Sequence, residues 1–116
     1  MKKHSIILAA LTLASPAAFA DGNAANGSKL FEAHGCAQCH GSNGISAADQ
    51  PLHAPILAGQ YKDYLIQALR EYKLNQRKGS AMNGMAAPLT DQDVKDLAEY
   101  LSGLSGPLDN IPDAGH

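Results

Sequence analysis

The most constraining feature of this chain is Cys36-Ala37-Gln38-Cys39-His40, in which an imidazole directly follows two thiols three residues apart. This pattern is typical of covalent haem attachment. Each cysteine sulfur adds to one haem vinyl group, and the adjacent histidine binds the iron through a neutral ring nitrogen. The motif therefore predicts one haem c, attached through Cys36 and Cys39, with His40 as the proximal iron ligand.

Two other uses of a Cys-x-x-Cys pair fit this chain less well. Redox-active disulfides of this spacing follow a βαβ pattern, whereas alanine, glycine and polar residues surround this motif. A structural zinc site needs a second pair of cysteine or histidine ligands, and the chain holds only two cysteines.

The N-terminal segment 1–20 has the pattern of a cleaved secretory signal peptide. Its basic residues Lys2 to His4 precede a short apolar run, Ile6 to Leu13, and Ala18-Phe19-Ala20 offers small residues at the positions that signal peptidase reads. The apolar run is too short to span a bilayer, although a retained anchor stays open. We therefore expect export, and a chain that does not span the membrane once the signal is removed.

Composition limits what the remaining chain can do. It is short enough to form one domain, and it has no tryptophan and only 5% aromatic residues, so its own core would be small. A haem would supply a large apolar surface for that core. The formal net charge is −2, and no basic stripe with interleaved aromatic residues is present, which argues against nucleic acid as a partner.

The periodicity predicts an all-α domain over residues 21–104. Apolar residues recur at helical spacing in three stretches, 24–34, 61–74 and 91–104, and none alternates as a strand would. Asp21 or Asn23 is placed to cap the first helix, and Thr90 with Asp93 to cap the third. The stripe of the second stretch consists of Tyr61, Tyr64, Leu65, Ala68, Leu69 and Tyr72. Residues 105–116, rich in glycine, proline and aspartate, are expected to form a flexible surface tail.

The second axial ligand decides the chemistry of a haem iron. A methionine thioether raises the reduction potential and suits electron transfer. Outside the signal segment the methionines are Met82 and Met85, which lie in one loop that Gly79, Gly84 and Pro88 keep from being helical throughout. The other candidates are three histidines, His34, His53 and His116, of which only His53 is a serious rival.

Three further features accompany the haem motif: Gly41 directly after it, the segment Pro55-Ile56-Leu57-Ala58-Gly59-Gln60, and Met82 before a capped C-terminal helix. With these features the chain resembles a class I cytochrome c. Within that class it is most similar to one half of the dihaem cytochromes c4 and to the small monohaem cytochromes c553. The resemblance implies three main helices and loops around one covalently bound haem.

The resemblance also implies roles for single residues. Met82 matches the axial methionine, with Met85 as the fallback and otherwise a packing residue, and the Pro55 carbonyl matches the acceptor that orients the proximal histidine. Gly27 and Tyr100 match the crossing of the first and last helices. The chain departs from the pattern in having one haem motif, so a homodimer is possible, and in a longer loop 41–54.

These features predict a soluble one-electron carrier of a bacterial periplasm, not an enzyme. Its partners would be redox proteins, for example a membrane-bound oxidase or reductase. The alternatives are a haem c subunit of a larger oxidoreductase such as a flavocytochrome and, with less support, an open-site haem enzyme or gas sensor. A basic cluster at the end of the second helix either steers an acidic partner or complements the helix dipole; its members are Arg70, Lys73, Arg77 and Lys78.

Overall fold

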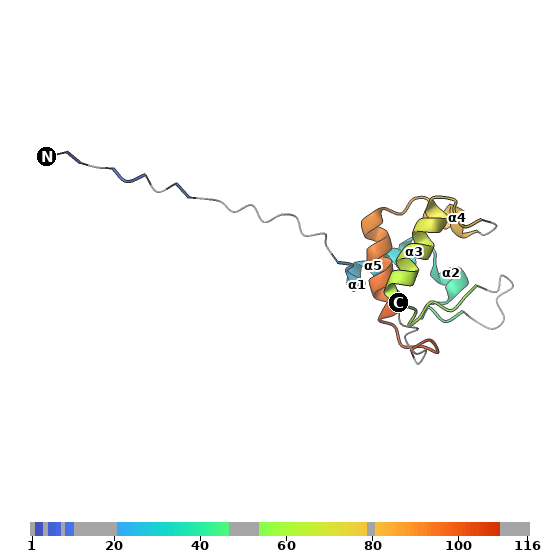
Figure 1. Cartoon of the computed structure of the whole chain (residues 1–116). Coiled ribbons are helices and arrows are strands. Elements are labelled where there is room, and N and C mark those ends of the chain that lie inside the picture. Colours follow the sequence, from blue (N-terminus) through green and yellow to red (C-terminus); the bar gives the residue numbers. More distant parts are fainter. Residues whose placement is uncertain are drawn as a thin grey trace.

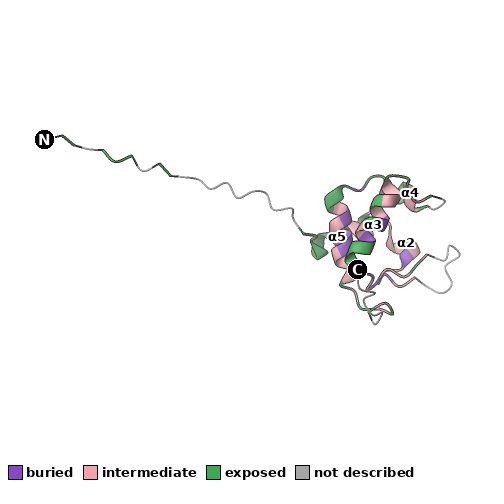
Figure 2. Ribbon diagram, in the orientation of Figure 1, coloured by how far each residue is buried: buried purple, intermediate pink, exposed green. Residues whose placement is uncertain are grey.

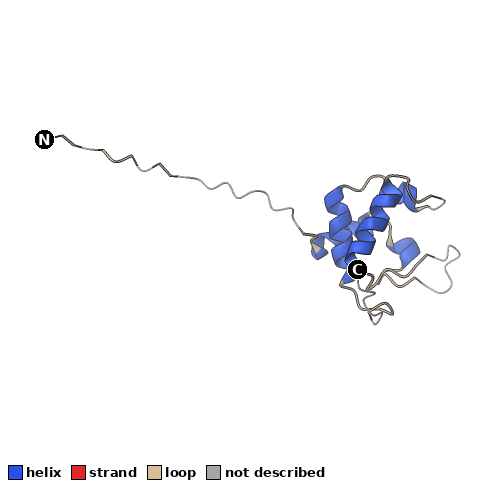
Figure 3. Ribbon diagram, viewed as in Figure 1, coloured by secondary structure: helices blue, strands red, loops and turns tan. Residues whose placement is uncertain are grey.

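The computed structural model describes residues 2–3, 5–7, 9–10, 21–46, 54–78 and 81–109. Within these ranges the chain forms five helices and no strand (Figures 1 and 3). The helices are α1 (Ala24–Ala33), α2 (Ala37–His40), α3 (Lys62–Lys73), α4 (Met82–Ala86) and α5 (Asp91–Ser102). The expected all-α fold is therefore confirmed, and its three main helices are α1, α3 and α5.

Helices α1 and α5 cross at close range because Gly27 has no side chain. A Cβ atom at this position would overlap the Asp96 carbonyl oxygen and lie 2.7 Å from Cβ of Tyr100. The Tyr100 ring then packs against Phe31, with ring centroids 5.7 Å apart and planes inclined by 58°, within the range of favourable aromatic pairs. The crossing predicted from Gly27 and Tyr100 is confirmed.

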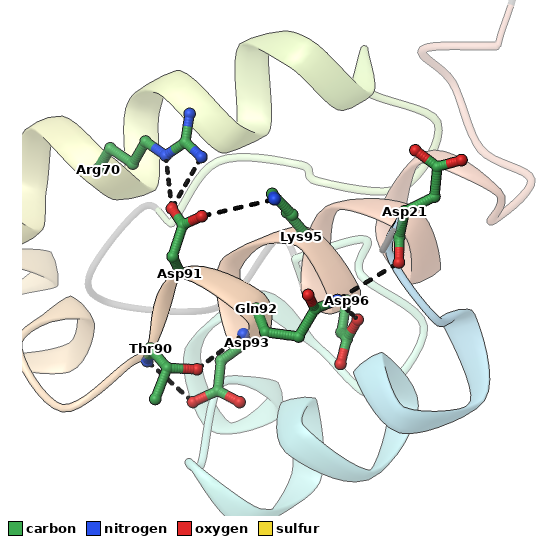
Figure 4. Close-up of polar contacts among 8 residues, drawn as sticks. All are labelled: Asp21, Arg70, Thr90, Asp91, Gln92, Asp93, Lys95 and Asp96. Atoms are coloured by element: carbon green, nitrogen blue, oxygen red, sulfur yellow. Dashed lines mark hydrogen bonds and ion pairs between the residues drawn. The ribbon is translucent and has the colours of Figure 1, made fainter. Parts of the chain in front are cut away.

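Both long helices of the crossing begin at the predicted capping residues. The Asn23 side chain accepts a hydrogen bond from the backbone N–H of Asn26 at 2.8 Å. Thr90 and Asp93 form a reciprocal capping box at the start of α5 (Figure 4), with bonds of 3.0 and 2.9 Å. Each cap satisfies N–H groups that have no partner inside the helix.

The core lies between α1, α3 and α5 (Figure 2). Of the α3 stripe, only Leu65 and Ala68 are buried; Tyr61 and Tyr64 are 39% and 44% exposed, contrary to expectation. Tyr61 precedes the helix, and the Tyr64 ring faces the Arg77 guanidinium at 5.9 Å instead of the core. The buried cluster consists of Phe31, Leu65, Ala86, Leu89, Val94, Leu97, Ala98 and Leu101.

The described parts of the two ends lie outside the helices. Residues 105–109 contain a hydrogen-bonded turn in which the Gly106 N–H donates to the Asp109 carboxylate at 2.9 Å. The residues expected at the signal-peptidase site, 18–20, lie outside the described residues. No helix in the ranges given above has the length and apolar character needed to cross a bilayer.

Candidate haem site

The short helix α2 carries the predicted attachment motif. Cys36 is its N-cap, and its carbonyl accepts the N–H of Cys39 at 3.3 Å and of His40 at 3.0 Å. Residues three and four apart lie on the same side of a helix, so one turn brings the two thiols and the imidazole together. Both cysteines are free thiols and half-buried.

Burial raises the pKa of the Cys36 thiol above its usual value. A backbone hydrogen bond partly opposes this effect, and the neighbouring Cys39 adds to it. Desolvation disfavours the charged form of a thiol, so Cys36 stays protonated at neutral pH. It therefore lacks the depressed pKa that activates the thiolate of redox-active Cys-x-x-Cys pairs.

His40 is buried, with only 6% of its surface exposed. Its Nδ1–H donates a hydrogen bond to the Pro55 carbonyl oxygen at 2.9 Å. In the neutral imidazole this bond places the proton on Nδ1 and leaves the lone pair on Nε2, which is the arrangement of a metal-binding histidine. The structure thus brings His40 and Pro55 together in the way the resemblance implied.

The segment that carries Pro55 is fixed by backbone hydrogen bonds around Gly44. The Gly44 carbonyl accepts the N–H groups of Leu57 and Ala58 at 2.8 and 3.0 Å. Gly44 itself has a φ of +72°, and a Cβ atom there would lie 3.3 Å from the Ala58 nitrogen, so the position favours glycine. The Gly59 N–H bonds to the Leu101 carbonyl of α5 at 3.0 Å, which holds the segment to the core.

Helix α4 carries both candidate methionines. Met82 is its first residue and is half-buried. Met85 is 37% exposed. The next residue, Ala86, is completely buried, and it fixes which side of α4 faces the core.

Of the three histidine candidates for the second axial position, the structure describes only His34. His34 is the half-buried C-cap of α1, whereas His53 and His116 lie outside the described residues. Over the described ranges no group of three or more histidine, cysteine, aspartate or glutamate side chains is placed to hold a metal ion.

The basic cluster of α3 is engaged within the protein. Arg70 donates two hydrogen bonds to Asp91 at 2.9 and 2.7 Å (Figure 4), and these bonds, with Lys95, hold the pKa of the Asp91 carboxyl below its usual value. Lys73 donates to backbone carbonyls of the segment after α4, and Arg77 pairs with Glu71 at 3.3 Å. These contacts favour a structural role for three of its four charges over partner steering.

The sequence matches the cytochrome c family over residues 24–105. The chain belongs to this family. Cytochromes c carry electrons on covalently bound haem c, and Cys36 and Cys39 supply the two thioether positions in this member. The free thiols on one helical turn, next to a buried histidine whose Nδ1 is bonded to the Pro55 carbonyl, fit that cofactor.

This cytochrome c is similar in sequence to several named bacterial cytochromes. It is 45% identical over 65 residues to cytochrome c4 of Thiocapsa roseopersicina, covering 56% of this chain and 32% of the relative. It is 40% identical over 70 residues to cytochrome c-554(548) of Halomonas halodenitrificans, covering 58% and 81%. Another relative, the cytochrome subunit of sulfide dehydrogenase of Chlorobaculum tepidum, is 32% identical over 70 residues, 60% of each chain.

A solved structure supports the fold. The cytochrome c4 structure of Acidithiobacillus ferrooxidans superposes with a TM-score of 0.63 at 34% identity, covering 76% of this chain and 53% of the other. The chain thus matches about a third of the length of the Thiocapsa cytochrome c4 and about half of this solved chain. The predicted class I cytochrome c fold, similar to one half of a cytochrome c4, is confirmed.

Sequence reasoning assigned no role to Asn83, which lies beside Met82. Its side chain donates to the carbonyls of Tyr72 and Arg77. A single asparagine next to a methionine gives no signal of such bonds, since the acceptors are backbone atoms 11 and 6 residues away.

Proposed function

We propose that this cytochrome c is a one-electron carrier whose haem iron is bound axially by His40 and Met82. The observation that carries the proposal is the buried His40, whose Nδ1–H is bonded to the Pro55 carbonyl at 2.9 Å. The haem supplies an iron that alternates between the ferric and ferrous states. The protein supplies the fixed ligands.

Each residue of the site has a distinct part in this proposal. Cys36 and Cys39 would hold the haem by two thioether bonds. The bond to Pro55 holds the His40 ring in one orientation and one tautomer. Met82 is preferred to Met85 because it is half-buried and is followed by Asn83, whose side chain donates to the Tyr72 carbonyl in α3, whereas Met85 is partly exposed.

Two permanent axial ligands favour electron transfer over catalysis. A methionine that stays bound leaves no position for a substrate, and the redox change then needs little rearrangement of the protein. We propose that the carrier acts in a bacterial periplasm with redox proteins as donor and acceptor. The apparent leader at residues 1–20 supports export.

The visible spectrum of the holoprotein tests the ligands. We expect a far-red sulfur-to-iron charge-transfer band in the ferric state and no response of the ferrous state to carbon monoxide. The band should disappear in Met82→Ala and persist in Met85→Ala, which is the matched control on the same helix. A high-spin ferric spectrum with ready carbon monoxide binding in the wild-type protein would instead indicate an open iron site.

A second candidate function is a haem subunit of a larger oxidoreductase. The relative described as the cytochrome subunit of sulfide dehydrogenase favours it. The same ligands would then serve a permanent partner. Co-purification with a catalytic chain in a fixed ratio would support this function, and a free monomer or homodimer from the native source would support the mobile carrier.

A further inference from the structure

The Asn83 side chain joins α4 to the end of α3. Its amide nitrogen donates to the Tyr72 carbonyl at 3.1 Å and to the Arg77 carbonyl at 2.6 Å. An asparagine amide has two N–H donors, and these two bonds use both. Since Asn83 is the second residue of α4, the bonds fix the backbone directly beside Met82.

The Tyr72 and Arg77 carbonyls that accept the Asn83 bonds lie in a well-held part of the chain. Tyr72 lies in the last turn of α3, where its carbonyl also accepts the Asn75 N–H at 3.2 Å, and Asn75 with a φ of +56° turns the chain back before Arg77. The Arg77 guanidinium lies 5.3 Å from the Tyr72 ring centroid and 3.3 Å from the Glu71 carboxylate. The acceptors of the Asn83 bonds are therefore held by contacts of their own.

Helix α3 holds the other end of the methionine segment as well. The Lys73 ammonium donates to the Ala87 carbonyl at 3.0 Å and also to the Leu89 carbonyl. These bonds lie after α4, whereas those of Asn83 lie at its start. Figure 1 shows α4 beside the end of α3. The Asn83 side chain thus anchors the start of α4, where Met82 lies.

We propose that Asn83 is a positioning residue, which keeps Met82 in place for the iron by hydrogen-bonding α4 to the end of α3. This inference rests on the proposed His40/Met82 ligation. It concerns how firmly the methionine stays bound rather than whether it binds. A side chain that only stabilised the fold would affect the global stability without specifically affecting how firmly the methionine is bound.

Imidazole binding to the ferric holoprotein measures how firmly the methionine stays bound. Imidazole can bind the iron only when the methionine is dissociated, so its apparent affinity is its affinity for the open iron multiplied by the fraction of protein in that state. Loss of the Asn83 bonds should raise the imidazole affinity of Asn83→Ala by about tenfold, as expected for one or two hydrogen bonds. Asn83→Gln, which keeps the two donors on a longer side chain, should lie in between.

Two comparisons separate positioning from general loosening. Gln92→Ala removes an amide-donated bond within α5, to Asp96 at 2.9 Å, and should leave the imidazole affinity unchanged. In the Met82→Ala background, the added Asn83→Ala change should have no effect, because no methionine remains to be positioned. Denaturant unfolding of every holoprotein variant reports its global stability.

The outcomes test the positioning role of Asn83 and the His40/Met82 ligation separately. A tenfold effect that vanishes in the Met82→Ala background supports the positioning role. The positioning role is overturned if Asn83→Ala binds imidazole with the wild-type affinity, or if the same increase occurs in the Met82→Ala background. In either case a far-red band in the wild-type protein still supports the ligand assignment. A wild-type protein without the band overturns both.

Discussion

Gly27 shows how one absent side chain determines the packing of two helices. A Cβ atom at this position would overlap the Asp96 carbonyl and crowd the Tyr100 side chain, so α1 and α5 approach to a distance that any Cβ atom would prevent. A glycine inside a helix costs about 1 kcal/mol relative to alanine. The close crossing offsets that cost.

Gly27→Ala is therefore expected to destabilise the holoprotein in spite of alanine's better helix propensity. Because an overlap with backbone atoms cannot be relieved by a side-chain rotation, we expect a loss of about 1–3 kcal/mol in the free energy of unfolding. Gly103→Ala is the matched control, because its φ is −83° and its new Cβ would meet only ordinary contacts at 3.4 Å or more. Denaturant titration of both variants measures the difference, and equal stabilities would contradict the argument.

At the scale of elements, α1 and α5 are joined by a buried carboxylate. Asp96 is 3% exposed and accepts bonds from the Asn23 backbone at 2.7 Å and from the Asn26 and Gln92 side chains at 2.6 and 2.9 Å. Burial alone would raise the pKa of Asp96, but these donors outweigh it and lower the pKa. Negative charge near the start of α1 is also favoured by the helix dipole.

The lowered pKa of Asp96 predicts how stability depends on pH. A carboxyl with a lower pKa in the folded state contributes stability above its unfolded pKa of about 3.9, and the contribution is lost as the pH falls through the folded value. Asp96→Asn should therefore be less stable than the wild type at pH 7, and the difference should narrow as the pH falls below about 4. Unfolding titrations at several pH values test this, and a difference that stays constant with pH would contradict it.

The sequence predicts the long elements better than the short ones. Helices α1, α3 and α5 begin and end within two residues of their predicted bounds, since each has a repeating apolar face and two have clear caps. Helices α2 and α4 contain four and five residues, too few for a period to show. The role of Asp96 was also missed, because an acidic residue in the first turns of α5 has a sufficient explanation in the helix dipole.

The sequence likewise predicts the local part of the candidate site better than its long-range contacts. Cys36, Cys39 and His40 are adjacent in sequence, so their local motif predicts them. The bond from His40 to Pro55 spans 15 residues, and only the family resemblance suggested it. The internal partners of Arg70 and Lys73 depend on where α4 and α5 pack, which the charge pattern of α3 alone does not specify.

At the scale of the whole molecule, the protein core in the described part of the chain is small. The largest completely buried side chains there are Phe31 and Val94, and a domain of this size buries a smaller fraction of its surface than a larger domain does. A covalently bound haem adds apolar area that the side chains alone do not provide. The cofactor thus belongs to the core as well as to the redox chemistry.

Preventing haem attachment should therefore leave the chain loosely folded or unfolded. The double variant Cys36→Ala/Cys39→Ala, purified without haem, should show reduced helical circular dichroism and no cooperative denaturant transition. The wild-type holoprotein is the control and should unfold in one sharp step. A native-like cooperative transition in the haem-free variant would show that the side chains suffice.

The hydrogen bond from Asn23 to Asp96 joins residues 73 positions apart. Closing so long a loop costs chain entropy, whereas the contacts among α3, α4 and α5 are close in sequence. We therefore expect the C-terminal helices to assemble first and α1 to dock last. Contacts that form after the folding transition state affect mainly the rate of unfolding. The crossing of α1 and α5 would then govern how long the folded protein persists, and much less how quickly it forms.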